Sequence, residues 1–395
     1  MNNLDLSSIA ADWVESIKKL PMLQNLHLSH CKLQTPSIGI SNSSLGFLGH
    51  LKTLDLSNNN LTGNFFRILE VLNVGSNSLN LTLLDLSFNS LEGAISESFL
   101  SCLPNLQVLG LSHNFLTLSL SSDWVPPFHL KVMKLSSCNL GPNFPTWVHT
   151  HMDFEYLDIS CNGIRDFIPD WFWNLSYKLR YLNLSYNSLS GTLPNTTLHL
   201  EYNCQIDLSY NEFAGEGVKA EYHNTIALLK LIDLSANQLT GQIPEGLTSL
   251  YELVSLNLSR NHFSGKIPEK IGQLTQLNSL DLSNNRLTGR IPLSMANIYF
   301  LGYLDLSNND LCGAIPKGTQ LQSFDASKYA GNPQLCGLPT LNVCPGDEIR
   351  QRSPGPQGNN KHDHWKENMG FYISLIFGFV IGFWGVCWTL LLPSS

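Results

Sequence analysis

The sequence predicts a solenoid of short parallel strands followed by one transmembrane helix. An L-x-L-S string recurs along most of the chain, and its first apolar residue falls 24 positions apart in the run Leu256, Leu280 and Leu304. Charged residues make up only 14% of the 395 residues, below the roughly 25% of ordinary soluble domains. Residues 370–392 carry no charge, and about 20 apolar residues are enough for a helix to cross a bilayer.

The repeat copies are recognised by their first apolar strand residue. From Leu84 onward the interval stays between 24 and 26 residues, and a fixed period of this size is typical of a solenoid. The intervals of 18 and 12 residues on either side of Leu72 are too short for a coil, so we expect missing or distorted coil material near residues 64–83. The predicted starts are Leu4, Leu26, Leu54, Leu72, Leu84, Leu109, Met133, Leu157, Leu182, Ile206, Ile232, Leu256, Leu280 and Leu304.

The copy LNSLDLSNNRLTGRIPLSMANIYF, from Leu277 to Phe300, shows the role of each position. Alternation at Leu280, Asp281 and Leu282 predicts a short strand with both leucines pointing inward and the aspartate outward. Burying each such leucine is worth roughly 1.5 to 3 kcal/mol, provided that a neighbouring coil covers it. The sheet built from these strands therefore has one apolar face and one exposed face.

An asparagine follows each strand at the inward turn. Its side chain can hydrogen-bond backbone groups of adjacent coils, which would otherwise cost about 1 to 3 kcal/mol each when buried. Further along the copy, Gly289, Ile291 and Pro292 supply a bend, a buried apolar residue and a stop to strand pairing. We expect a ladder formed by Asn59, Asn89, Asn114, Asn162, Asn187, Asn211, Asn237, Asn261, Asn285 and Asn309, with Cys31 and Cys138 in the same position of their own coils.

The form LxxLxxLxLSxNxLxGxIPxx, with its Gly and Ile-Pro, resembles the plant extracellular leucine-rich repeat from about Leu84 to Pro316. This resemblance implies a leucine-rich-repeat solenoid with a parallel β-sheet on the concave face and an irregular or 3-10 convex side. The text GEGVKAEYHNTIALLK interrupts the repeat and is followed by four regular coils. That arrangement resembles plant leucine-rich-repeat receptor-like proteins, such as the Cf resistance proteins and the receptors for ethylene-inducing xylanase, whose ectodomains carry a non-repeat island before four terminal repeats.

The resemblance implies a domain order. After the repeats, FDASKYAGNPQLCGLPTLNVC fits the family's C-terminal cap, and Cys336 and Cys344 within it either form a disulfide in an oxidising compartment or remain two free thiols. The N-terminus lacks the features of a signal peptide, so we expect the chain to be incomplete at both ends. The expected parts are repeats in 1–215, an island remnant in 216–231, four terminal repeats in 232–320, the cap in 321–345, an extracellular stalk in 346–369, the transmembrane helix in 370–392 and a tail in 393–395.

The candidate ligand-binding residues lie on the exposed strand face. Outward aspartates could bind a cationic ligand, but we favour the interpretation that they are simply the usual residue of the repeat at this position. Departures from that template and exposed aromatic residues are more informative, because aromatic side chains are enriched in binding surfaces. The candidates are His27, Lys134, Tyr156, Tyr181, Ser255, Asn257, Ser279, Asp281, Tyr303 and Asp305.

Two further sets of residues carry expectations about modification and helix packing. Seven N-x-S/T sequons suit a secreted protein. Small residues on one face of the membrane helix would let another helix approach closely, although glycine is common in membrane helices. The sequons are at Asn42, Asn60, Asn80, Asn174, Asn183, Asn195 and Asn257, and the packing glycines are Gly378, Gly382 and Gly385.

The sequence excludes several function classes and favours a receptor. Net charge is −8, which makes nucleic acid an improbable partner, and no catalytic constellation is recognised. We expect no enzyme activity, no cofactor and no metal. The resemblance implies a single-pass type I receptor of the plasma membrane, without a kinase domain, that recognises an extracellular peptide, protein or glycan in plant immunity, or less plausibly development, and signals through adaptor and co-receptor kinases. The alternatives are a non-signalling fragment or decoy of such a receptor, or a wall-type inhibitor of a secreted hydrolase.

Overall fold

The computed structural model describes residues 5–6, 13, 17, 20, 22–35, 50–64, 80–150, 153–174, 178–193, 204–216, 229–317 and 320–345. Except for Pro345, these residues belong to the first of two compact units, Met1–Cys344. Within the described part of the chain no helix is long and apolar enough to cross a membrane, and the membrane segment expected at residues 370–392, with Gly378, Gly382 and Gly385, lies outside that part.

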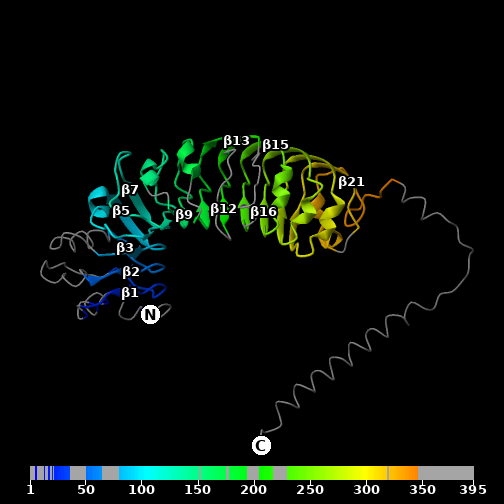
Figure 1. The fold of residues 1–395 in the computed structure, drawn as a ribbon. Coiled ribbons are helices and arrows are strands. Elements are labelled where there is room, and N and C mark those ends of the chain that lie inside the picture. Colours follow the sequence, from blue (N-terminus) through cyan, green and yellow to red (C-terminus); the bar gives the residue numbers. More distant parts are fainter. Residues whose placement is uncertain are drawn as a thin grey trace, which may run out of the picture. The chain divides into compact units, whose positions relative to one another are not determined.

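A 12-stranded parallel sheet, here called the main sheet, forms the exposed strand face expected from the repeat. Its strands follow one another in chain order, as Figure 1 shows for β9, β12 and β16. The central apolar residues are in register from strand to strand, for example Leu256 with Leu280 and Leu280 with Leu304. The strands are β1 (Asn25–His27), β2 (Thr53–Asp55), β4 (Leu83–Asp85), β6 (Val108–Gly110), β8 (Val132–Lys134), β9 (Tyr156–Asp158), β10 (Tyr181–Asn183), β12 (Gln205–Asp207), β14 (Leu231–Asp233), β16 (Ser255–Asn257), β18 (Ser279–Asp281) and β20 (Tyr303–Asp305).

A second layer of strands follows the inward turn of the coils and is divided into two sheets. One sheet has three strands, β3 (Thr62–Gly63), β5 (Ser90–Ser96) and β7 (Phe115–Ser119). The other has seven, β11 (Ser190–Gly191), β13 (Glu212–Glu216), β15 (Gln238–Gln242), β17 (His262–Lys266), β19 (Arg286–Arg290), β21 (Asp310–Ala314) and β22 (Gln334–Cys336).

Short helices close the coils after the second layer. They are α3 (Glu97–Leu100), η3 (Thr146–Thr150), η4 (Asp170–Asn174), η6 (Glu245–Ser249), η7 (Ile271–Gln273), η8 (Leu293–Asn297), η9 (Leu321–Ser323) and η10 (Ala326–Tyr329), all of them 3-10 helices except α3. One hydrophobic core runs through the coils, and repeat leucines such as Leu280 and Leu304 are fully buried in it. The leucine-rich-repeat solenoid with a 3-10 side is therefore confirmed.

The asparagine ladder is also confirmed. Asn261 is typical: its Nδ2 donates to the carbonyl oxygens of Leu234, Leu258 and Ser259, and its Oδ1 accepts the N–H of Leu239. The ladder continues into the cap, because Asn332 makes the same kind of bonds and accepts the N–H of Leu311. The ladder thereby satisfies backbone groups of each coil and joins it to the next.

Cys138 takes the ladder position in its coil but performs only half of the asparagine's role. Its Sγ donates to the carbonyl oxygens of Leu111 and Ser136, which an asparagine Nδ2 would bind. A thiol offers only a weak acceptor, so the N–H of Leu116, which corresponds to Leu239, loses the side-chain acceptor that other coils provide. This substitution marks a local break in the ladder.

The predicted strand start at Leu72 is wrong. Strand β2 pairs directly with β4, with Leu54 in register with Leu84, so no strand can lie between them in the main sheet. The physical reason is length, since the 12 residues between Leu72 and Leu84 cannot complete a turn of the solenoid. Residues 65–79 of this stretch lie outside the described residues, as does Leu4 of the first expected coil.

Candidate functional site

The exposed face of the main sheet holds the candidate residues, and the sheet collects them into three groups. Lys134, Tyr156 and Tyr181 lie on the neighbouring strands β8, β9 and β10. The terminal group lies on β16, β18 and β20 and consists of Ser255, Asn257, Ser279, Asp281, Tyr303 and Asp305. His27 lies apart on β1, next to Asp55 and Thr53, where its Nδ1 is 3.6 Å from Asp55 Oδ2.

The outward aspartates have a structural role, as the template interpretation suggests. One carboxylate oxygen of Asp158 accepts both the N–H and the hydroxyl of Ser160, at 3.0 and 2.7 Å. Asn183 bonds Ser185 through its Oδ1 in the same way, which shows that the position needs an acceptor and not a charge. The conserved geometry of this turn therefore uses Oδ1 and leaves only Oδ2 for other contacts.

Most of these second oxygens are occupied. Lys134 Nζ lies 3.2 Å from Asp85 Oδ2, and it spans β6 because Gly110 there has no side chain in the way. In the terminal group, the Tyr303 hydroxyl lies 3.4 Å from Asp281 Oδ2. Asn257 Nδ2 similarly donates to Asp233 Oδ2 at 3.0 Å.

A central patch, defined as Tyr156, Asp158, Tyr181, Asn183 and Asp207, differs from the rest of the face. The rings of Tyr156 and Tyr181 stack with centroids 4.2 Å apart and 7° between their planes. Among the contacts of the described residues, neither Asp158 Oδ2 nor Asp207 Oδ2 has a hydrogen-bond or ion-pair partner. The patch thus presents two carboxylate oxygens beside an aromatic stack.

Electrostatics distinguish the titrating groups of the central patch. Burial raises the pKa of Asp207 above its ordinary value, and the charges of Asp233 and Asp158 add to the rise while hydrogen bonds from Ser209 oppose it. Burial also raises the pKa of Tyr156, with further contributions from Tyr181 and Asp158, so this phenol stays neutral. A cationic group beside the patch would relieve the repulsion among the carboxylates.

The terminal group has a partner from the cap that the sequence analysis missed. Lys328 Nζ lies 3.0 Å from Asp305 Oδ2 and 4.7 Å from the ring centroid of Tyr303. The cap is held on the last coil by backbone bonds from the N–H of Leu306 to Lys328 and from the N–H of Asn308 to Ala330, and the disulfide that joins Cys336 to Cys344 closes a loop within the cap. Lys328 stands four residues before the ladder residue Asn332, at the position that Asp305 holds before Asn309, but the cap lacks the L-x-L-S string that marks this position in the repeats.

A row of side chains beside the strand face was also missed. The residue before each ladder position adopts a positive φ, as Tyr186 and Tyr210 do at 54° and 52°. Their rings stack with centroids 4.3 Å apart, and Arg260 Nη1 donates to the Tyr210 hydroxyl at 3.2 Å. The sequence signal for this row is the second x of the L-x-L-S-x-N string, directly before the ladder asparagine, because it is the one variable residue in that turn.

The sequons fall into different environments. The side chains of Asn183 and Asn257 are engaged within the main sheet, whereas Asn60 and Asn80 are exposed. Asn42, Asn195 and the side chain of Asn174 lie outside the described part of the chain. Within that part no group of three or more His, Cys, Asp or Glu residues is arranged to hold a metal ion.

Comparison with known proteins identifies the repeat. A family model described as Leucine Rich Repeat matches residues 50–72, 80–102, 153–175, 178–200, 228–250, 252–274 and 276–298. The solved ectodomain of the Arabidopsis receptor kinase HAESA, in complex with an N-terminally extended IDA peptide hormone, superposes with a TM-score of 0.61 at 28% identity, covering 84% of this chain and 57% of that one. The structure titled PEPR1-AtPEP1 gives a TM-score of 0.58 at 27% identity, with coverages of 76% and 44%.

Two curated relatives come from tomato, Solanum lycopersicum. Receptor-like protein EIX2 is 38% identical over 186 residues, which cover 42% of this chain and 18% of that protein. Receptor-like protein EIX1 is 46% identical over 125 residues, covering 32% and 12%. The matches thus span less than a fifth of either relative. The chain carries leucine-rich repeats and is similar to plant receptor-like proteins.

Proposed function

We propose that this chain belongs to a cell-surface receptor-like protein that binds an extracellular peptide on the main sheet. In this proposal it acts in plant immunity and signals through a recruited adaptor receptor kinase. The similarity to EIX1 and EIX2, and to ectodomains solved with peptide ligands, supports this proposal. The observation that carries it is the central patch, where the side chains are half-buried and two carboxylate oxygens have no hydrogen-bond or ion-pair partner among the described residues.

The chemistry of the patch favours a peptide with a basic side chain. Asp158 and Asp207 stand on β9 and β12 with one strand between them, so they are separated by roughly two strand spacings, about 10 Å. A guanidinium group reaching between them would meet Asp158 and Asp207 at its edges and the Tyr156–Tyr181 stack beside it. The polar side chains of Ser255 and Ser279 further along the face would bind the remainder of an extended peptide.

Attachment and recruitment are the remaining parts of the proposal. Residues 370–392 anchor the chain in the plasma membrane, with the repeats outside. The adaptor and co-receptor kinases contact the glycine face of that helix and the terminal group, which lies next to the cap. Lys328 belongs to the same contact surface because it covers Asp305 and Tyr303.

The experiment uses the full chain, secreted through a heterologous signal peptide and purified in detergent, with tetra-arginine as the probe. The variant Asp158→Asn/Asp207→Asn keeps the acceptor that Ser160 and Ser209 need, as Asn183 demonstrates at the same position, but removes both charges. We expect its affinity for tetra-arginine to fall roughly tenfold or more, which corresponds to about 1.4 kcal/mol.

The matched control is Asp281→Asn/Asp305→Asn. It changes the net charge equally, but the outer oxygens of this pair already contact Tyr303 and Lys328. Affinity in the control should stay within about twofold of the parent. Equal losses of affinity in both variants would show that only net charge matters. Unchanged affinity in both variants would show that the central patch is not the ligand site.

A further inference from the structure

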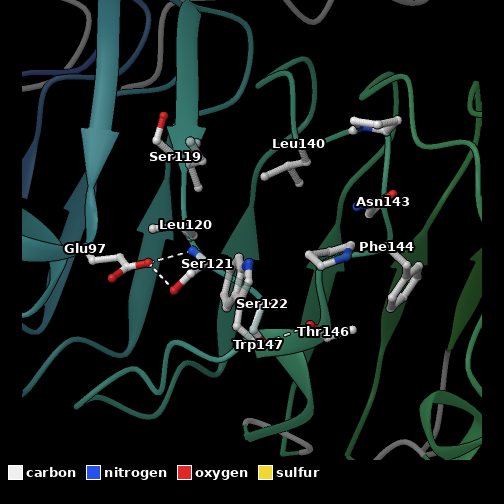
Figure 2. A pocket seen from close by; sticks show the side chains of 14 residues that line it. Glu97, Ser119, Leu120, Ser121, Ser122, Leu140, Asn143, Phe144, Thr146 and Trp147 are labelled. Carbon is white, nitrogen blue, oxygen red and sulfur yellow. Dashed lines mark hydrogen bonds between the residues drawn. The ribbon is translucent and has the colours of Figure 1, made fainter.

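A hollow of about 550 Å³ opens on the second layer, away from the candidate residues of the main sheet. Strand β7 and the turn after it form one wall, and residues 140–147 form the other. Figure 2 shows Ser119 and Leu120 on the strand side, and Leu140, Asn143 and Phe144 across from them. The hollow has the size of an ordinary ligand site.

The wall at β7 is an open sheet edge. Strand β7 ends the three-stranded sheet, and among the described residues no backbone hydrogen bond joins it to residues 139–145. In the preceding coil, the N–H of Leu91 points toward the following coil and donates to Asn114 Oδ1. By the repeat, Leu116 corresponds to Leu91, so the N–H groups of Leu116 and Leu118, two residues apart on one strand, point toward the hollow.

The edge is open because the next coil packs away from it. The N–H of Gly141 donates to the carbonyl oxygen of Asn162, and the N–H of Phe144 donates to Asp166 Oδ2. A Cβ on Gly141 would lie 2.3 Å from the carbonyl oxygen of Gly163, so only glycine allows this approach. The segment around Gly141 therefore hydrogen-bonds the following coil and not β7. Cys138 also lacks the side-chain oxygen that would have accepted the N–H of Leu116.

The lining of the hollow has a charged end and an apolar wall. Glu97 Oε1 accepts the N–H and the hydroxyl of Ser121, at 2.5 and 2.6 Å, and these bonds leave Oε2 available (Figure 2). Glu97 is the only charged residue in the lining, so a complementary ligand carries a positive charge there. Leu118, Leu140 and Phe144 contribute apolar surface along the rest.

We infer that an extended peptide segment with a basic side chain binds in this hollow by adding a strand to β7. Donors and acceptors repeating along an open strand edge are matched by another extended backbone, which is the recognition mode of strand addition. The basic side chain would lie at Glu97. This site is separate from the main sheet and does not depend on the proposed function.

The test selects ligands from a displayed library of random dodecapeptides with the full chain, purified in detergent. Selected peptides are then titrated against Asn143→Trp, which fills the hollow from an exposed residue without a hydrogen-bonded side chain among the described contacts. Thr288→Trp is the control, because Thr288 is exposed on β19, whose edges are both paired. Strand addition predicts that the affinity of selected peptides falls roughly tenfold or more in Asn143→Trp. Their affinity for Thr288→Trp and for Asp158→Asn/Asp207→Asn should equal that for the parent.

Two further measurements identify the mode of binding. Hydrogen exchange at the amides of Leu116 and Leu118 should be fast in the free protein and slowed several-fold by the peptide. Glu97→Gln keeps an acceptor for Ser121 and should weaken only peptides that contain Lys or Arg. The inference is overturned if no selected peptide is sensitive to Asn143→Trp, if these amides are already protected in the free protein, or if binding protects only the main sheet.

Discussion

Replacing Asn261 by alanine tests the ladder quantitatively. Asn261 is 4% exposed, and its side chain donates to three carbonyl oxygens. When the Asn261 side chain is removed, each of these oxygens keeps one other hydrogen bond, from Asn237, Asn285 and Ala236 respectively. The buried N–H of Leu239 has no such alternative. One unpaired buried donor costs about 1 to 3 kcal/mol, and three weakened acceptors add about 1 kcal/mol. We therefore expect the free energy of unfolding to fall by about 3 kcal/mol.

The assay is urea unfolding followed by tryptophan fluorescence. At a slope of about 2 kcal/mol/M, the midpoint should fall by about 1.5 M. Asn261→Cys should cost less than alanine, because a thiol can donate to the carbonyl oxygens as Cys138 does. The control is Asn278→Ala, which removes one bond from an exposed side chain to the carbonyl oxygen of Phe300 and should cost less than about 1 kcal/mol. A loss in Asn261→Ala no larger than in this control would refute the reasoning.

Three more predictions concern other parts of the chain. Mass spectrometry of secreted, non-reduced protein should show Cys336 bonded to Cys344, and replacing both by serine should cost about 2 to 3 kcal/mol in the chain-entropy model; two alkylated thiols would contradict this. Asp207→Asn should be at least as stable as the parent at neutral pH, because burial disfavours the folded carboxylate above its raised pKa; that advantage should shrink as pH falls through the folded pKa, and a less stable variant at neutral pH would count against it. The full chain should resist carbonate extraction, and Gly378→Leu/Gly382→Leu should reduce co-precipitation of an adaptor receptor kinase at unchanged surface level; release by carbonate, or undiminished pairing, would refute the respective claim.

The sequence predicted the features that repeat. A buried leucine, an outward aspartate and an inward asparagine recur at fixed spacing, so the main sheet and the ladder could be placed residue by residue. Strand pairing followed in every described copy, and it failed at Leu72 because a match to the string does not guarantee enough chain for a coil.

The sequence could not predict features that depend on one particular neighbour. The bridge from Lys134 to Asp85 exists because Gly110 happens to lie between them, and the contact of Lys328 with Asp305 depends on how the cap folds back. The open edge of β7 follows from Cys138 and Gly141 together, which the repeat string treats as unrelated departures from its template. Contacts between coils, not the pattern within one coil, decide these cases.

Photo-crosslinking at the central patch tests most directly whether the main sheet binds the ligand. Tyr181 is replaced by benzoyl-phenylalanine in the full chain on plant cells, which are irradiated with the peptide fraction of plant extracellular fluid. We predict a crosslinked peptide containing Lys or Arg that is lost when Asp158→Asn/Asp207→Asn is added and is not formed by the same probe at exposed Tyr251. Equal crosslinking at positions 181 and 251, or crosslinking that persists in the double variant, would contradict a ligand site on the main sheet.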